Sequence, residues 1–183
     1  SGILYACLPQ MGRSAALVTT KLVGHNFLHV RVDLIPSHWY SWDFDVTEGE
    51  RHVAHLDVSA WGEKGILTID GVDHRVYREG VGSGEFLLER DGVVLARATK
   101  PSAFRSAFEV RHEGRTYELA KESVWQRRFV LRSGNAEIGS LAPRRVLGRE
   151  AIATLPESWP LSLKVFVIWL VVILWKRAAA AAS

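Results

Sequence analysis

The chain has very little cysteine or methionine, because Cys7 and Met11 are the only residues of their types among 183. A single cysteine excludes an intramolecular disulfide framework and a zinc site built from several cysteines. It also favours a reducing, cytoplasmic compartment. The hydrophobic content of 48% and the charged content of 23% are ordinary for a globular domain, which excludes disorder and collagen-like structure.

Long hydrophobic runs are absent except near the C-terminus, where Val165–Trp175 contains only apolar residues. As a helix this run reaches about 16 Å, which is about half the thickness of a bilayer core. Extending it would place Lys176 and Arg177 in hydrocarbon at about 2.5–3.5 kcal/mol each. A buried core element is therefore the favoured interpretation, and a C-terminal membrane anchor remains the alternative.

The flanks of this run predict a helix from about residue 160 to 177, although Val, Ile and Trp by themselves favour strands. Ser158 can cap the helix, Pro160 fits its first turn, and Ala178–Ala182 can continue it at little cost. A helix that is apolar on every side must be enclosed on every side.

From about Tyr40 the chain alternates apolar and polar residues, and turn signals such as Asp70-Gly71 and Asp91-Gly92 separate short segments. An alternation of period two is typical of strands with one buried and one wet face. The sequence therefore predicts an all-β chain of short strands.

A repeat of about 42 residues underlies these segments. Phe44, Phe86 and Phe129 are spaced by 42 and 43, and small residues recur at the same interval at Ala54, Ala96 and Gly139. Three units with room for four strands each predict about twelve strands. A chance alignment of short hairpins is the alternative explanation.

About twelve strands leave a lumen that needs a plug, since roughly eight strands already fill a barrel with side chains. Val165–Trp175 is the one uniformly apolar segment that can fill it, and the small residues Ala54, Ala96, Ala98 and Gly139 would make room. The expected fold is an all-β closed barrel of three four-strand repeats around a C-terminal hydrophobic helix. The barrel and its helix would span residues 37–177, between an N-terminal extension at 1–36 that can hold a strand and an alanine-rich tail at 178–183.

This layout over about residues 37–177, ending in Leu155–Leu161 and the apolar helix, resembles the tubby-like superfamily. That family includes the tubby C-terminal domain and the phospholipid scramblases, and the chain resembles a small member of bacterial type. The resemblance implies a twelve-stranded barrel around a central helix, membrane or phosphoinositide association, and no enzymatic chemistry. The cysteine-rich segment and acidic calcium loop expected of scramblases are missing, so scrambling is not expected, and no family site residue can be matched.

The histidines do not predict a metal site. His52 and His55 are three residues apart on a predicted strand, which would send their side chains to opposite faces. The spacing of the other five matches no known zinc motif. No cofactor is predicted, and no serine–histidine–acid arrangement can be nominated, although an enzyme whose site carries no local signature stays open.

Positive charge gathers in the C-terminal half. Residues 1–96 carry 8 Lys and Arg against 13 Asp and Glu, whereas residues 97–183 carry 15 against 7. Such density can face anionic lipid or nucleic acid, or it can be a solvated barrel exterior. Among the tryptophans that could lie at a membrane interface, Trp125 is the best candidate for an exposed anchor because it adjoins two arginines. The candidate lipid-binding residues are Lys100, Arg105, Trp125, Arg127, Arg128, Arg144, Arg145 and Arg149.

The favoured function is a non-enzymatic module that binds an anionic phospholipid surface from the cytoplasmic side of the membrane. A barrel that binds a small apolar ligand is the alternative, and it requires an unfilled cavity. A protein-binding module also stays open. Nucleic acid is disfavoured, because no stacking platform or base-reading helix can be located.

Overall fold

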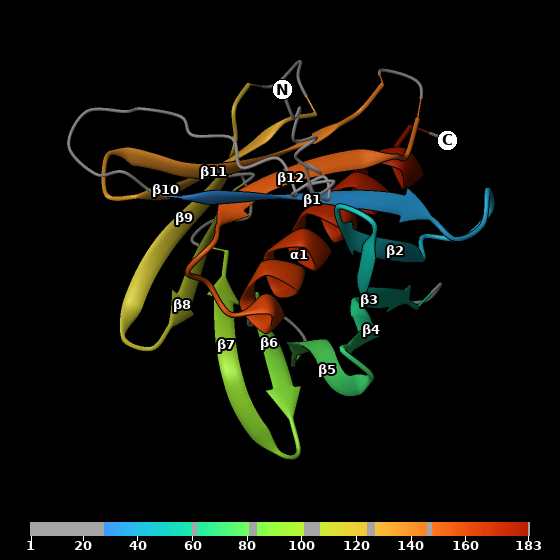
Figure 1. The fold of residues 1–183 in the computed structure, drawn as a ribbon. Helices are drawn as coiled ribbons and strands as arrows, with labels where there is room; N and C mark the ends of the chain where they lie inside the picture. The colour runs from blue at the N-terminus through green and yellow to red at the C-terminus, as the bar shows by residue number, and fades with distance from the viewer. Residues whose placement is uncertain are drawn as a thin grey trace, which may run out of the picture.

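The computed structural model describes residues 28–59, 62–80, 84–100, 107–123, 127–145 and 148–182. Twelve antiparallel strands form a closed barrel in which chain neighbours pair and β1 pairs with β12 (Figure 1). The predicted fold class is therefore confirmed. The strands are β1 (His29–Pro36), β2 (Phe44–Glu48), β3 (Arg51–Val58), β4 (Lys64–Ile69), β5 (Val72–Glu79), β6 (Glu85–Arg90), β7 (Val93–Thr99), β8 (Ala107–His112), β9 (Arg115–Lys121), β10 (Phe129–Ser133), β11 (Ala136–Pro143) and β12 (Ala151–Pro156).

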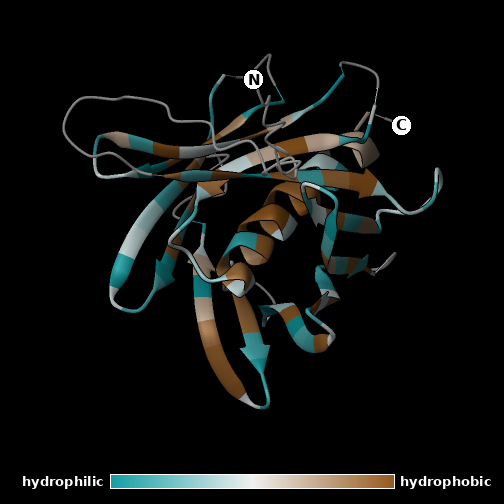
Figure 2. Ribbon diagram, viewed as in Figure 1, coloured by the Kyte–Doolittle hydropathy of each residue, from teal (hydrophilic) through white to brown (hydrophobic). Residues whose placement is uncertain are grey.

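A single helix, α1 (Leu161–Ala180), fills the lumen. Its side chains from Val165 to Ile173 are at most 1% exposed, and Figure 2 shows α1 coloured largely as hydrophobic inside the sheet. Pro160 occupies the N-cap position without a side-chain cap, so the expectation that Ser158 caps the helix was wrong. The apolar run is thus a plug that the barrel's own strands enclose.

Each repeat contributes a large phenylalanine to the lumen. Phe44, Phe86 and Phe129 are buried at the starts of β2 and β10 and near the start of β6. Strands β11 and β12 approach each other closely, because a Cβ added to Gly139 would lie 2.7 Å from the Thr154 carbonyl oxygen. The third unit, β10 to β12, is completed around the barrel by β1, which comes from the stretch before residue 37.

A β-bulge occurs in the second strand of every repeat. Val53, Leu95 and Ile138 are the extra residues, and they are 42 and 43 positions apart. A bulge bends its strand and increases the local twist, which helps a sheet to close into a barrel. The freed carbonyl oxygens accept hydrogen bonds from the Asp70 backbone N–H, the His112 ring and the His29 ring respectively.

The first bulge overturns the expectation for His52 and His55. With Val53 left out of the pairing, both histidines point to the same outer face of the barrel. His55 Nδ1 lies 2.8 Å and His52 Nε2 lies 3.3 Å from Asp45 Oδ1. The prediction failed because the rule of alternating faces holds only for an uninterrupted strand.

The barrel has two different ends. We call the end with the connections 49–50, 70–71, 91–92, 113–114, 134–135 and 157–160 the turn end. The opposite end, where the longer connections leave β1, β3, β5, β7, β9 and β11, is the loop end. Helix α1 begins at the turn end, where buried Lys164 lies 3.6 Å from the Glu48 carboxylate. It finishes at the loop end, where Arg177 pairs with Glu63.

Candidate functional site

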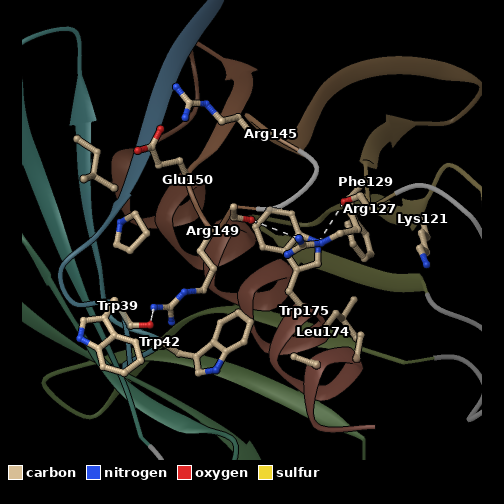
Figure 3. A pocket seen from close by; sticks show the side chains of 15 residues that line it. Trp39, Trp42, Lys121, Arg127, Phe129, Arg145, Arg149, Glu150, Leu174 and Trp175 are labelled. Atoms are coloured by element: carbon tan, nitrogen blue, oxygen red, sulfur yellow. Dashed lines mark hydrogen bonds between the residues drawn. The ribbon is translucent and has the colours of Figure 1, made fainter. Parts of the chain in front are cut away.

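A cleft of about 980 Å³ opens at the loop end, beside the last turns of α1 (Figure 3). We call it the end cleft. Its lining consists of Ile35, Pro36, Trp39, Trp42, Lys121, Arg127, Phe129, Arg145, Gly148, Arg149, Glu150, Leu174, Trp175, Ala178 and Ala179. These residues come from the end of β1, from three loop-end connections and their flanking strands, and from the helix. Closing the barrel is therefore what brings them together.

Two arginine–tryptophan pairs line the end cleft on opposite sides. The Arg149 guanidinium lies 5.6 Å from the Trp42 ring centroid, and the Arg127 guanidinium lies 5.5 Å from the Trp175 ring centroid. In Figure 3 Trp42 and Arg149 lie on one side, while Trp175 and Arg127 lie on the other. A cation over an indole face is attracted by the ring electrons, and the attraction grows as water is excluded.

Arg149 also fixes the β1–β2 connection. Its guanidinium donates hydrogen bonds to the backbone oxygens of His38, Trp39 and Ser41. Each of these contacts joins residues more than 100 positions apart, so they hold the connection 37–43 against the connection 144–150. All of these partners are carbonyl oxygens, and none of the described carboxylates forms an ion pair with Arg149.

Arg127 is anchored in the same way, by uncharged groups. Its guanidinium donates to the Gly148 carbonyl oxygen at 3.3 Å, and its own carbonyl oxygen accepts from Trp175 Nε1 at 3.1 Å. The Arg127 side chain is exposed at the wall of the cleft. It makes no ion pair with the residues that the structure describes.

The charge of the lining is strongly positive. Lys121, Arg127, Arg145 and Arg149 face a single carboxylate, that of Glu150. Glu150 lies 3.7 Å from Arg144, which also donates to Asp33 at 2.6 Å. Arg145 is exposed and has no ion-pair partner within the described ranges. The cleft thus combines aromatic walls with two arginines, Arg127 and Arg145, that have no carboxylate partner among the described residues, which suits an anionic group attached to an apolar one.

The structure places the predicted lipid-binding residues in three groups. Arg127, Arg145 and Arg149 come together in the end cleft. Arg128 and Arg144 are instead held in ion pairs, and Lys100 follows β7 at the loop end without lining the cleft. Arg105 and Trp125 lie outside the described residues.

The ion pairs of Arg128 and Arg144 shift the pKa values of their groups. The hydrogen bond from Arg128 to Glu122 raises the pKa of the guanidinium further above its ordinary value, although partial burial opposes this. Burial favours the neutral form of Asp33, but hydrogen bonds from Arg31 and Arg144 outweigh it and lower its pKa. Both arginines are therefore committed to structural partners.

Sequence reasoning counted Trp39 and Trp42 among the tryptophans that could lie at a membrane interface, but it expected most of these to be buried and singled out only Trp125 as an exposed anchor. Trp39 is 87% exposed and Tyr40 is 69% exposed, whereas Tyr40 was expected to begin a half-buried strand. Strand β2 begins only at Phe44, and Trp42 is half-buried beneath Arg149. The adjacent aromatics Trp39 and Tyr40 were a usable signal, because neighbours in a strand cannot both face the core.

The histidine pair beside Asp45 does not form a metal site. Among the residues that the structure describes, no three His, Cys, Asp or Glu side chains are grouped in a way that could hold a metal ion. Asp45 instead accepts a hydrogen bond from Ser37 at 3.0 Å, which ties the β1–β2 connection to the barrel wall. This cluster therefore supports the loop end.

No protein-family model, curated protein or solved structure matches this chain. The class that the fold and site define is a closed twelve-stranded barrel with a helical plug and a basic, tryptophan-lined cleft at one end. Within the described part of the chain, no helix is long and apolar enough to cross a membrane.

Proposed function

We propose that the protein is a non-enzymatic binding module that attaches peripherally to anionic phospholipid surfaces through its loop end. The observation that carries this proposal is the end cleft, in which Arg127 and Arg145, without a carboxylate partner among the described residues, line the same space as the exposed Trp39. Basic residues near an acidic bilayer contribute about 1 kcal/mol each. Tryptophan and tyrosine favour the boundary between headgroups and acyl chains.

The geometry supports the loop end as the contacting surface. Arg127, Arg145 and Lys121 lie at the same end of the barrel as Trp39 and Tyr40. A membrane surface at this end can therefore contact the cations and the aromatic side chains at the same time. The layout of barrel and helix agrees with the tubby-like resemblance, whose members associate with membranes. We propose membership of that superfamily on this layout.

The test is sedimentation of the full chain with vesicles of phosphatidylserine and phosphatidylcholine, compared with phosphatidylcholine alone, at low and high salt. We expect binding to the anionic vesicles that weakens with salt, because screening acts on exposed charges. The double variant Arg127→Gln and Arg145→Gln should bind at least tenfold more weakly.

Arg115→Gln is the matched control for Arg127→Gln and for Arg145→Gln taken singly, since it removes one positive charge. Arg115 is exposed at the turn end, in the β8–β9 hairpin, and its substitution removes the same charge far from the cleft. Binding of this variant should stay within about twofold of the unchanged chain. Equal and negligible sedimentation of the unchanged chain with both vesicle types would overturn the proposal.

A further inference from the structure

Helix α1 occupies the lumen with side chains that are at most 1% exposed from Val165 to Ile173, so the described residues give no support to an apolar ligand inside the barrel. Space remains in the end cleft beside the helix. Its volume of about 980 Å³ is near the upper limit of small-molecule sites, which span about 300–1,000 Å³. The cleft can therefore hold a whole small ligand as well as touch a surface.

The walls of the end cleft divide into two kinds. One part is apolar and comes from Trp42, Leu174, Trp175 and the small side chains of Ala178 and Ala179. Trp42 and Leu174 are half-buried and Ala178 and Ala179 are exposed, whereas Trp175 is already buried. The first four leave apolar surface that an alkyl chain could cover, and covering it is favourable. This part of the site fits the tail of a single-chain amphiphile.

The other part is cationic, and two of its arginines, Arg127 and Arg145, have no carboxylate partner in the part of the chain that the structure describes. Arg127 is fixed over Trp175 with only a carbonyl oxygen as partner, and exposed Arg145 lines the same cleft. The guanidinium group presents a planar fork of donors that matches a carboxylate with two parallel hydrogen bonds. Arg149 adds positive potential, although its Nη1 and Nη2 groups already donate to three backbone oxygens.

We propose that the end cleft binds one molecule of a long-chain carboxylate, with the alkyl chain against Trp42 and Leu174 and the carboxylate at Arg127. The inference rests on the proposed function in placing the lipid contact at this cleft. It goes further in naming a free single-chain ligand, taken from solution, as the occupant.

The experiment is isothermal titration of the full chain with decanoate below its micelle-forming concentration. Butanoate carries the same head on a short chain, and 1-decanol carries the same chain without charge. We expect decanoate to bind with one-to-one stoichiometry and both comparison compounds to bind at least tenfold more weakly. Butanoate lacks most of the apolar contact, and 1-decanol lacks the carboxylate that the arginine binds. Equal affinity for decanol, or for butanoate, overturns the inference.

Two substitutions test the two parts of the site. Ala178→Trp fills the cleft from the exposed last turns of α1, and Ala180→Trp adds the same group on the same helix to a residue that does not line the cleft. Arg127→Gln removes the carboxylate contact, and Arg115→Gln is its control. Decanoate affinity should fall about tenfold or more in the first member of each pair and stay within about twofold in the second. Loss of affinity that is equal within each pair contradicts the proposed site.

The vesicle assay separates this inference from the proposed function. Ala178→Trp keeps every cation, so it should still sediment with anionic vesicles while losing decanoate. If the unchanged chain sediments with anionic vesicles but takes up no decanoate, the ligand is wrong and the membrane proposal stands. If it binds decanoate one-to-one but does not sediment with any vesicle, the inference stands and the membrane proposal fails.

Discussion

The turn end and the loop end of the barrel are ordered by different interactions. At the turn end, Asp91 and Gly92 both have positive φ, as do the two residues of the neighbouring turns at 70–71 and 113–114. Such turns follow the natural twist of an antiparallel pair and need no distant partner. Trp159 covers this end of the lumen, where its ring lies 4.7 Å from that of Tyr117.

The loop end relies on contacts between residues far apart in the chain. Arg149 holds three carbonyl oxygens of the β1–β2 connection, and Asp45 holds Ser37 and two histidines. Most of these groups are charged or polar and partly exposed. The comparison teaches that the turn end relies mainly on local turn geometry and burial, with the Lys164–Glu48 ion pair as a distant contact, whereas the loop end relies mainly on distant polar and charged contacts and keeps an open cleft.

The largest expected contrast is between the tryptophans of the two ends. Trp159→Ala at the turn end should lower the free energy of unfolding by about 3–5 kcal/mol, because it removes a buried aromatic side chain. Trp39→Ala at the loop end should change it by less than about 0.5 kcal/mol, since Trp39 is 87% exposed. Urea unfolding followed by far-ultraviolet circular dichroism measures both. Similar losses in the two variants would contradict the contrast.

An intermediate effect is expected from glycines at the two ends. Gly92 has a φ of 79° with open space around its Cα, so Gly92→Ala should cost about 1–2 kcal/mol of stability through backbone strain alone. Gly148 at the loop end has no positive φ, and an added Cβ would meet only the Arg145 Cβ at 3.7 Å. Gly148→Ala should therefore stay within about 0.5 kcal/mol. Thermal unfolding measures the stability of both variants. A larger loss of stability in Gly148→Ala than in Gly92→Ala would contradict the role given to backbone strain at Gly92.

The smallest effect concerns acid sensitivity at the loop end. Partial burial favours the neutral form of Asp45, but hydrogen bonds from His55, Ser37 and His52 outweigh it and lower the pKa of Asp45. The ionised group therefore adds stability above its unfolded pKa of about 3.9, and this stability is lost as the pH falls through the lowered folded value. Asp45→Asn should cost less than about 1 kcal/mol near pH 7, because the site is partly exposed.

The pH profile of that substitution is the discriminating measurement. The stability difference between Asp45→Asn and the unchanged chain should shrink as the pH falls below about 4, since protonated Asp45 resembles Asn in charge. Denaturant titrations at a series of pH values record it. A difference that stays constant down to about pH 2 would show that the Asp45 charge does not stabilise the loop end.

The candidate site could be predicted only in part. The basic connections were visible in the sequence, and three of the predicted residues, Arg127, Arg145 and Arg149, do meet in one cleft. Arg144 was indistinguishable from them until its carboxylate partner was known, because Asp33 lies 111 residues away in the chain. Whether a surface charge is neutralised depends on neighbours that are distant in the sequence, and the spacing of residues along the chain does not reveal them.

By itself the sequence determined the number of strands and the nature of the plug. The spacing of Phe44, Phe86 and Phe129 reflects a repeated strand pattern, and the uniformly apolar run near the C-terminus must be buried away from water. Both features can be read from the order of residues along the chain. Tertiary structure alone decided that His52 and His55 share a face, that Trp39 is exposed, and that the two arginine–tryptophan pairs line one cleft. These outcomes depend on a bulge and on ring closure, which join residues that no local pattern connects.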